Sequence, residues 1–136
     1  MIYESLTGNT RRAAGLIAAE LTTQGIGAVV CPVDRIDYQA LSRADLVIVG
    51  AWTDGMVFFG QRPGRAHRLR AMPVMDGKRA LVFCTYAIDP GKVLEKLTRV
   101  VEDRGAVVLG GMALRRDRLV EGSMEFVARL LEAVEA

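Results

Sequence analysis

The chain has 136 residues and a mass of 14.8 kDa, enough for one domain, residues 1–136, with a buried core of two or three layers. Its 18 lysines and arginines nearly balance its 16 aspartates and glutamates, so the total charge favours neither a nucleic-acid-binding protein nor a membrane-surface protein. Cys31 and Cys84 are too far apart to form a C-x-x-C pair, which excludes a thioredoxin-type redox site and a zinc knuckle.

The cellular location is predicted from two features that the sequence lacks, a membrane-spanning segment and a signal peptide. No apolar stretch reaches the roughly 18 consecutive residues that a membrane-spanning helix needs, and the first residues lack the basic start and apolar run of a signal peptide. We therefore expect a soluble, cytoplasmic protein with free thiols and no membrane partner.

Five apolar runs are expected to form β-strands. They are rich in valine, isoleucine and leucine, and their apolar residues are continuous rather than alternating, which is typical of strands buried on both faces of a parallel sheet. In chain order they are residues 1–3, 28–31, 46–51, 80–83 and 106–109.

Helical patterns lie between these runs. Ala13, Ile17 and Leu21 recur every four residues after Thr10, and two further patterns follow Asp89-Pro90 and Ser123. Asp89 is predicted to cap its helix with Pro90 in the first position, and Gly25, Gly27 and Gly105 are predicted to follow helix ends. Residues 34–43 are too weakly periodic to predict a helix, and 59–71 are expected to form a loop with a short helix. This alternation predicts a doubly wound α/β fold with five parallel strands.

In such a sheet, ligands bind outside the carboxyl ends of the strands. Four segments follow predicted strands and are therefore candidates for a binding site: residues 4–10, 52–60, 85–89 and 112–120. The first of them leads into a helix, whose free N–H groups and dipole favour an anion.

The first segment is rich in small polar side chains. Ser5, Thr7, Asn9 and Thr10 offer hydrogen-bond donors without adding charge, which suits a phosphomonoester with its three acceptor oxygens. The alternative is that Thr10 only caps the helix and that the other side chains stabilise turns. Four such residues in six, together with a glycine, favour the phosphate site.

Residues 2–10, Ile-Tyr-Glu-Ser-Leu-Thr-Gly-Asn-Thr, followed by Ala14 and Ile17, resemble the phosphate-loop signature of the flavodoxin family. The resemblance implies a three-layer fold with five parallel strands in the order 2-1-3-4-5, and FMN as the cofactor. It also implies that the FMN phosphate is held by Ser5, Leu6, Thr7, Gly8, Asn9 and Thr10.

The same resemblance assigns the next two segments to the flavin ring. It implies contacts from Trp52, Thr53, Asp54 and Gly55 on one side and from Thr85, Tyr86 and Ala87 on the other. Trp52 would flank the ring and the Asp54-Gly55 peptide would turn toward its N5 atom, although either role could pass to Met56 or Phe58. The alternatives are that Trp52 plugs the end of the sheet and that Tyr86 packs on the following helix.

Other sites are excluded by position. Asp89-Pro90-Gly91-Lys92 resembles the end of a P-loop, but Tyr86 and Val93 stand where that motif needs glycine and serine or threonine. No G-x-G-x-x-G follows the first strand, and the aspartates and lysine of a response-regulator receiver domain are missing. His67 is the only histidine, so neither a histidine-based triad nor a histidine-rich metal site can form.

These observations favour an electron carrier that binds FMN and passes electrons between redox partner proteins, with no catalytic or metal-ligating side chain of its own. Residues 61–70 hold four arginines and no acid, so a partner with an acidic docking face is expected, while no aromatic platform indicates nucleic acid. Two alternatives remain: a small FMN-dependent oxidoreductase acting on a quinone-like or porphyrin-like substrate, and a flavin-free interaction module on the same fold.

Overall fold

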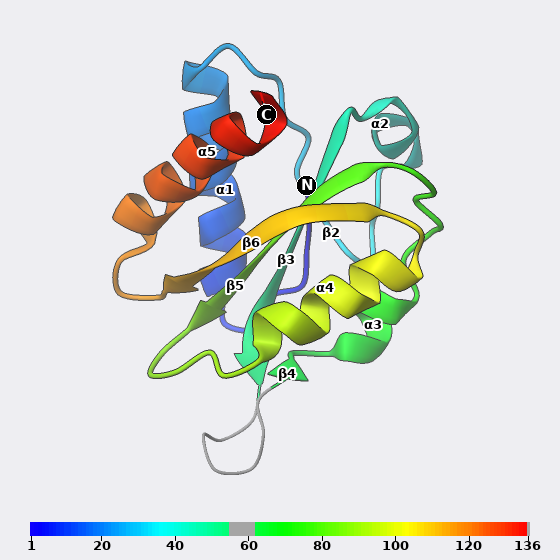
Figure 1. Ribbon diagram of the computed structural model, residues 1–136. Helices are drawn as coiled ribbons and strands as arrows, with labels where there is room; N and C mark the ends of the chain where they lie inside the picture. The colour runs from blue at the N-terminus through cyan, green and yellow to red at the C-terminus, as the bar shows by residue number, and fades with distance from the viewer. Residues whose placement is uncertain (55–61, 136) are drawn as a thin grey trace.

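Five parallel strands form the sheet in the computed structural model, which describes residues 1–54 and 62–135. Their order is β2-β1-β3-β5-β6, and a short strand, β4, pairs antiparallel with the end of β3 (Figure 1). This order confirms the predicted doubly wound sheet with strand order 2-1-3-4-5. The elements are β1 (Ile2–Tyr3), α1 (Asn9–Thr23), β2 (Cys31–Pro32), α2 (Tyr38–Arg43), β3 (Leu46–Asp54), β4 (Arg62–Pro63), α3 (Ala66–Arg70), β5 (Arg79–Tyr86), α4 (Val93–Asp103), β6 (Val107–Arg115) and α5 (Leu119–Glu135).

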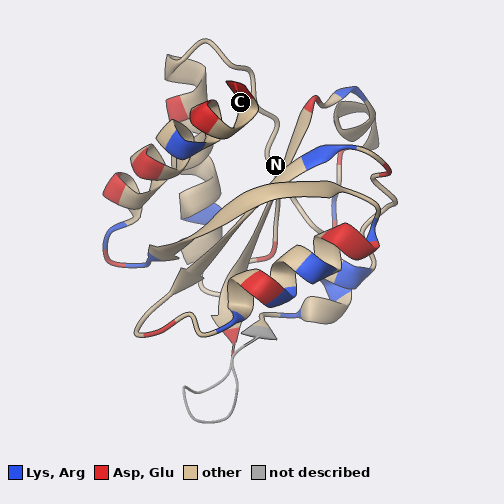
Figure 2. Ribbon diagram, in the orientation of Figure 1, with Lys and Arg blue, Asp and Glu red and all other residues tan. Residues whose placement is uncertain are grey.

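The three long strands carry charge only at their ends. In β3, β5 and β6 the charged residues are Asp54, Arg79 and Arg115, each the first or last residue of its strand (Figure 2). An uncharged middle is what burial between two helical layers requires, because an unpaired charge is costly to remove from water. The continuous apolar runs in the sequence therefore predicted the centre of the sheet correctly.

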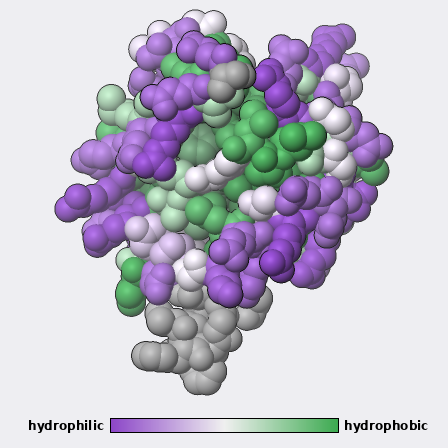
Figure 3. Space-filling view, in the orientation of Figure 1, coloured by the Kyte–Doolittle hydropathy of each residue, from purple (hydrophilic) through white to green (hydrophobic). Residues whose placement is uncertain are grey.

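Several boundaries differ from those predicted. Strand β6 extends to Arg115 because residues 107–115 pair with β5 through Gly110 and Gly111, with a register shift beside Leu81. As an edge strand it leaves Val107 and Leu109 exposed, and Figure 3 shows apolar surface where β6 crosses this face. The second strand consists of Cys31–Pro32 only.

The helix boundaries also differ. Helix α4 begins at Val93 rather than at Pro90, because the Asp89 carboxylate accepts the N–H of Gly91 (2.9 Å) in a turn before the helix. Helix α5 begins at Leu119, before Ser123, and a short helix, α2, forms within residues 34–43. Gly25 and Gly105 have positive φ angles after α1 and α4, as predicted, whereas Gly27 does not.

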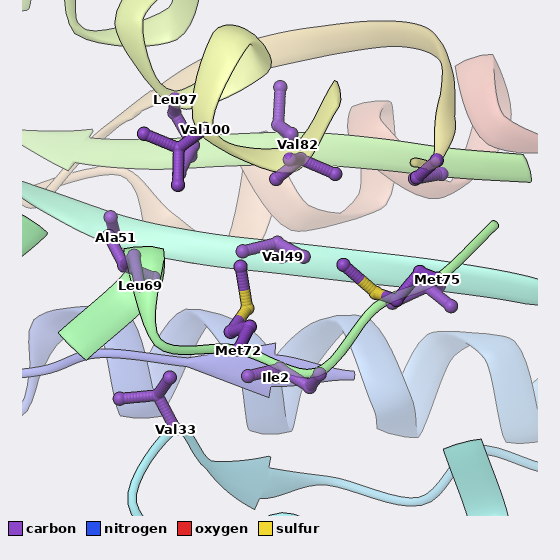
Figure 4. Close-up of a cluster of buried hydrophobic side chains, with 14 residues drawn as sticks. Ile2, Val33, Val49, Ala51, Leu69, Met72, Met75, Val82, Leu97 and Val100 are labelled. Atoms are coloured by element: carbon purple, nitrogen blue, oxygen red, sulfur yellow. The ribbon is translucent and has the colours of Figure 1, made fainter. Parts of the chain in front are cut away.

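Two apolar clusters hold the layers together. On one face, α1 and α5 cover the sheet around Phe83, whose ring meets that of Phe126 edge-on with centroids 5.8 Å apart. On the other face, α3, α4 and the segment after α3 cover it with Leu69, Met72 and Leu97 among others (Figure 4). This second cluster fixes α3 beneath the carboxyl end of β3, beside the first candidate loop.

At the amino ends of the strands the sheet is incomplete. Besides its pairing with β2, strand β1 reaches only Val49 and Gly50 of the nine-residue β3, and a cavity of about 540 Å³ opens beside residues 46–48 of β3. This cavity is at the opposite end of the sheet from residues 4–10 and so does not belong to the candidate site. Within the described residues, no helix combines the length and apolar character required to cross a membrane.

Candidate functional site

The loop from Glu4 to Gly8 is closed by its own side chains. The Ser5 hydroxyl accepts the N–H of Gly8 (3.1 Å), and the Asn9 amide donates to the Thr7 hydroxyl (3.2 Å). Gly8 has a φ of 95°, a left-handed conformation that glycine adopts at little cost. These contacts turn the chain sharply from β1 into α1.

The turn leaves the start of α1 without a cap. Gly8 occupies the N-cap position, no side chain there accepts a hydrogen bond from the helix, and the first turn has no acidic residue. The first intrahelical bond of this turn runs from Arg12 N–H to the Gly8 carbonyl, so the N–H groups of the residues before Arg12 have no partner within the helix. Helix α1 has 15 residues, and its uncapped start follows an uncharged loop of residues 5–8, which fits a phosphate group.

Thr10 connects this loop to β5. Its hydroxyl lies 2.9 Å from that of Thr85, and both residues are buried. The contact joins two segments that are 75 residues apart and that were predicted separately as parts of one site. The hydroxyl of Thr10 therefore has a partner in the protein, while its backbone N–H belongs to the uncapped first turn.

Trp52, near the end of β3, packs against Gly64. Its carbonyl accepts the N–H of Gly64 (2.8 Å), and a Cβ added to Gly64 would overlap the indole ring. The ring is partly exposed, and its Nε1 is buried without a hydrogen-bond partner among the described residues. The indole thus packs against the backbone of Gly64, the residue directly after β4.

Replacing Gly64 with alanine is expected to displace Trp52. The new methyl group would destabilise the protein by about 1–3 kcal/mol, typical of an overpacked site. Because the chain has one tryptophan, its fluorescence reports this residue alone, and we expect the emission maximum to move to longer wavelength.

Gly15 to alanine is the matched control, because a Cβ there meets nothing within 4 Å and the residue lies inside α1. This control should leave the emission unchanged and stabilise the protein by about 0.5–1 kcal/mol. Unchanged emission and stability in the Gly64 variant would contradict the close packing of indole on glycine.

The third segment projects from the end of β5. The carbonyl of Tyr86 accepts the N–H of Arg116 (2.9 Å), which ties it to the end of β6, and its side chain is partly exposed. Ala87 and Ile88 follow at the surface, and Ile88 is 85% exposed. The side chain of Tyr86 and those of the two residues after it are therefore accessible to the ring of a ligand.

The structure brings the candidate residues to the carboxyl ends of β1, β3 and β5. A cavity of about 470 Å³ lies between the first two segments and α3, and its lining includes Leu6, Trp52, Asp54, Arg65, His67 and Arg70. Thr53 lies beside Trp52 in β3 and pairs in register with Pro63 of β4. Gly55, Met56 and Phe58 lie outside the described residues.

The contribution of α3 was not predicted. Residues 62–70 were interpreted as a docking patch, and the structure adds that Arg65 and Arg68 form ion pairs with the buried Glu4 at the start of the first loop. The only signal in the sequence was the spacing of three residues between the two arginines, which places both on one side of a helical turn.

Both cysteines are free thiols, Cys31 half-buried and Cys84 buried. Burial raises the pKa of the Cys84 thiol to about 12, against a smaller opposite effect of the Thr53 side chain. The Cys84 thiol therefore stays protonated at neutral pH and is a poor nucleophile. No three metal-ligating side chains among the described residues gather at one place.

The parallel sheet with its flanking helices defines a doubly wound α/β protein, and its candidate site lies at the carboxyl edge of the sheet. The flavodoxin domain model matches residues 1–115, and the chain belongs to this family. The predicted resemblance to the flavodoxin family is thereby confirmed.

Solved structures agree with this assignment. Oxidised Flavodoxin 1 from Bacillus cereus is 26% identical, with a TM-score of 0.70 over 97% of this chain and 95% of that chain. Oxidised Flavodoxin 2 from the same organism is 23% identical, with a TM-score of 0.72 over 96% and 95%. The two-electron reduced flavodoxin of Megasphaera elsdenii, 20% identical, has a TM-score of 0.67 over 91% and 96%; these last two matches show the shared fold. A search of curated protein sequences finds no match.

Proposed function

We propose that this protein binds FMN and carries electrons between redox partner proteins. The observation that supports this most directly is the uncapped start of α1 behind an uncharged loop, which suits the phosphate of FMN. Family membership supports FMN rather than another phosphate ester. Bound FMN would supply an isoalloxazine ring that exchanges one or two electrons.

Each part of the site would have its own task. The phosphate would be held by Ser5, Leu6, Thr7, Gly8, Asn9 and Thr10 through backbone N–H groups and small polar side chains. Trp52 and Tyr86 would contact the ring from opposite sides, and the peptide from Asp54 to Gly55 would approach its N5 atom. Thr53, Thr85 and Ala87 would complete the walls of the ring site.

Family membership favours a carrier over an enzyme, although Asp54 and His67 are among the residues that line the cavity beside Trp52. His67, the only histidine, is exposed on α3, and the Cys84 thiol is buried. A small FMN-dependent oxidoreductase is the second candidate, and the cavity of about 470 Å³ beside Trp52 is the observation that favours it, because a planar quinone-like substrate would fit there.

The test is an absorbance titration of the purified protein with FMN, followed by stepwise reduction with dithionite. Binding followed by reduction in two separate one-electron steps would support the carrier. Binding followed by one two-electron step, together with turnover of a quinone-like or porphyrin-like substrate without a protein partner, would support the enzyme. Absence of FMN binding would leave a flavin-free interaction module.

The second electron is expected to enter at a less negative potential than in a flavodoxin with an acidic flavin site. A fully reduced flavin is anionic, and nearby carboxylates would repel it. Here Glu4 is paired with two arginines, and Asp117 beyond β6 is paired with Arg115 at 3.0 Å. A spectroelectrochemical titration at pH 7, run beside an acidic flavodoxin, checks this, and an equally low potential would contradict it.

The partner is proposed to present an acidic face. Basic residues lie on α3 and α4, which pack together, although α4 also carries Glu95, Glu102 and Asp103 (Figure 2). Complementary charge mainly accelerates encounter, so the association rate should fall as salt rises. A salt-independent rate of electron transfer to the partner would argue against this docking mode.

A further inference from the structure

Glu4 is an unusual residue at the start of a phosphate loop. It directly precedes Ser5, its side chain is only 3% exposed, and its N–H donates to the carbonyl of Gly50 (3.0 Å), which fixes its backbone in line with β3. A carboxylate this deeply buried must be paired, because removing an unpaired charge from water is costly. The protein therefore needs a cation at this position.

Two arginines pair with this carboxylate: Arg65, the residue just before α3, and Arg68 within it. Arg65 Nη1 lies 3.0 Å from Oε1, and Arg68 Nη1 lies 3.5 Å from Oε2. Arg65 is the only non-glycine residue in the described part of the chain with a positive φ, 50°. An arginine rarely adopts this conformation, so its contacts with Glu4 hold it there. We refer to Glu4, Arg65 and Arg68 as the Glu4 cluster.

The Glu4 cluster places charge next to the loop, because Glu4 directly precedes Ser5. Residues 5–10 carry no charged side chain, whereas two guanidinium groups against one carboxylate give the cluster a net charge of +1. A phosphomonoester brings about −1.5 to −2 charges at neutral pH. The sign of the cluster charge therefore decides whether this side of the loop attracts or repels it.

We propose that the Glu4 cluster sets the phosphate affinity of the loop. In the intact cluster Arg65 and Arg68 neutralise Glu4 and leave one positive charge that attracts the phosphate. Without the arginines, the buried carboxylate would repel it. The proposal rests on the proposed function, because it assigns to residues outside the loop the discrimination between FMN and riboflavin, which lacks the phosphate.

Four proteins separate the electrostatic role from a structural one. The wild type has a cluster charge of +1, Glu4→Gln has +2, the double variant Arg65→Gln with Arg68→Gln has −1 when Glu4 is ionised, and the triple variant has 0. We expect the ratio of FMN to riboflavin affinity to follow this charge, by about three- to tenfold per unit at low salt, and to shrink as salt rises. Arg99→Gln, on the exposed side of α4, is the matched control and should leave the ratio unchanged.

The decisive comparison is between the double and triple variants. If charge is the cause, the triple variant binds FMN more tightly than the double variant although it lacks more of the cluster. A cluster that only fastens α3 to the sheet would weaken both flavins alike and allow no such rescue. If the double variant does not fold, the comparison of Glu4→Gln with the wild type carries the test. A ratio that is flat across the folded variants would overturn the proposal.

Inorganic phosphate distinguishes this proposal from the proposed function. It should raise the thermal midpoint of the flavin-free protein in the same order, Glu4→Gln most and the double variant least. This order in a protein that does not bind FMN would support the cluster's role and reject the FMN carrier. If the protein binds FMN but the ratio of FMN to riboflavin affinity is the same in all variants, the FMN carrier would be supported and the role of the Glu4 cluster would be rejected. If the wild type neither binds FMN nor is stabilised by phosphate, both the proposed function and the role of the Glu4 cluster would be overturned.

Discussion

Replacing Asn9 with aspartate is expected to weaken FMN binding about a hundredfold while making the flavin-free protein more stable, by about 0.3–1 kcal/mol. Asn9 is the first residue of α1, whose first turn has no acid and no side-chain cap. A carboxylate there would occupy the positive end of the helix dipole in place of a phosphate. The helix end stabilises either a carboxylate or a phosphate, so the new carboxylate stabilises the flavin-free protein. The same carboxylate would repel the phosphate of FMN at close range, so FMN affinity falls.

The measurements are FMN and riboflavin titrations together with thermal unfolding of the flavin-free protein. Asn9→Ser is the matched control, because serine also loses the amide contact to Thr7 but adds no charge. It should reduce FMN affinity only slightly. Equal losses of FMN and riboflavin affinity in the aspartate variant would mean that the phosphate is not held at this helix end.

Replacing Gly50 with alanine is expected to destabilise the protein by about 2–3 kcal/mol, near the upper end for overpacking of a core. A Cβ at this position would overlap the ring of Phe83, which is fully buried and packs on Phe126. The carbonyl of Gly50 also accepts the N–H of Glu4, so displacement of this backbone would reach the phosphate loop. FMN affinity should therefore fall along with stability.

Chemical denaturation of four proteins checks the cause of this effect. Phe83→Leu shortens the obstructing side chain, so the double variant should be more stable than the sum of the two single losses predicts. Gly110→Ala is the control within the same sheet, because a Cβ there meets only Leu81 at 3.9 Å, an ordinary contact. Strict additivity of the Gly50 and Phe83 changes would show that their side chains do not compete for the same space.

The layers of the fold were predictable because they depend on short-range patterns. Val47, Ile48 and Val49 belong to an unbroken apolar run, which is characteristic of a central parallel strand, and β3 is one. Strand β6 was predicted too short because Gly110 and Gly111 are poor strand formers in isolation. Their backbone pairing with Leu81 and Val82 determines the strand, and only the neighbouring strand provides it.

The sequence by itself determined the turn at residues 5–9, because Ser5, Thr7, Gly8 and Asn9 interact within a few residues and a local pattern reveals local contacts. Only the tertiary structure decided what surrounds the loop. Thr10 meets Thr85, Gly64 lies on Trp52, and Arg65 pairs with Glu4 across 61 residues of chain. Each of these contacts depends on the order of strands in the sheet and on where α3 packs. A buried carboxylate and its distant cations leave no periodic signal, since their attraction depends on distance in space rather than on separation along the chain.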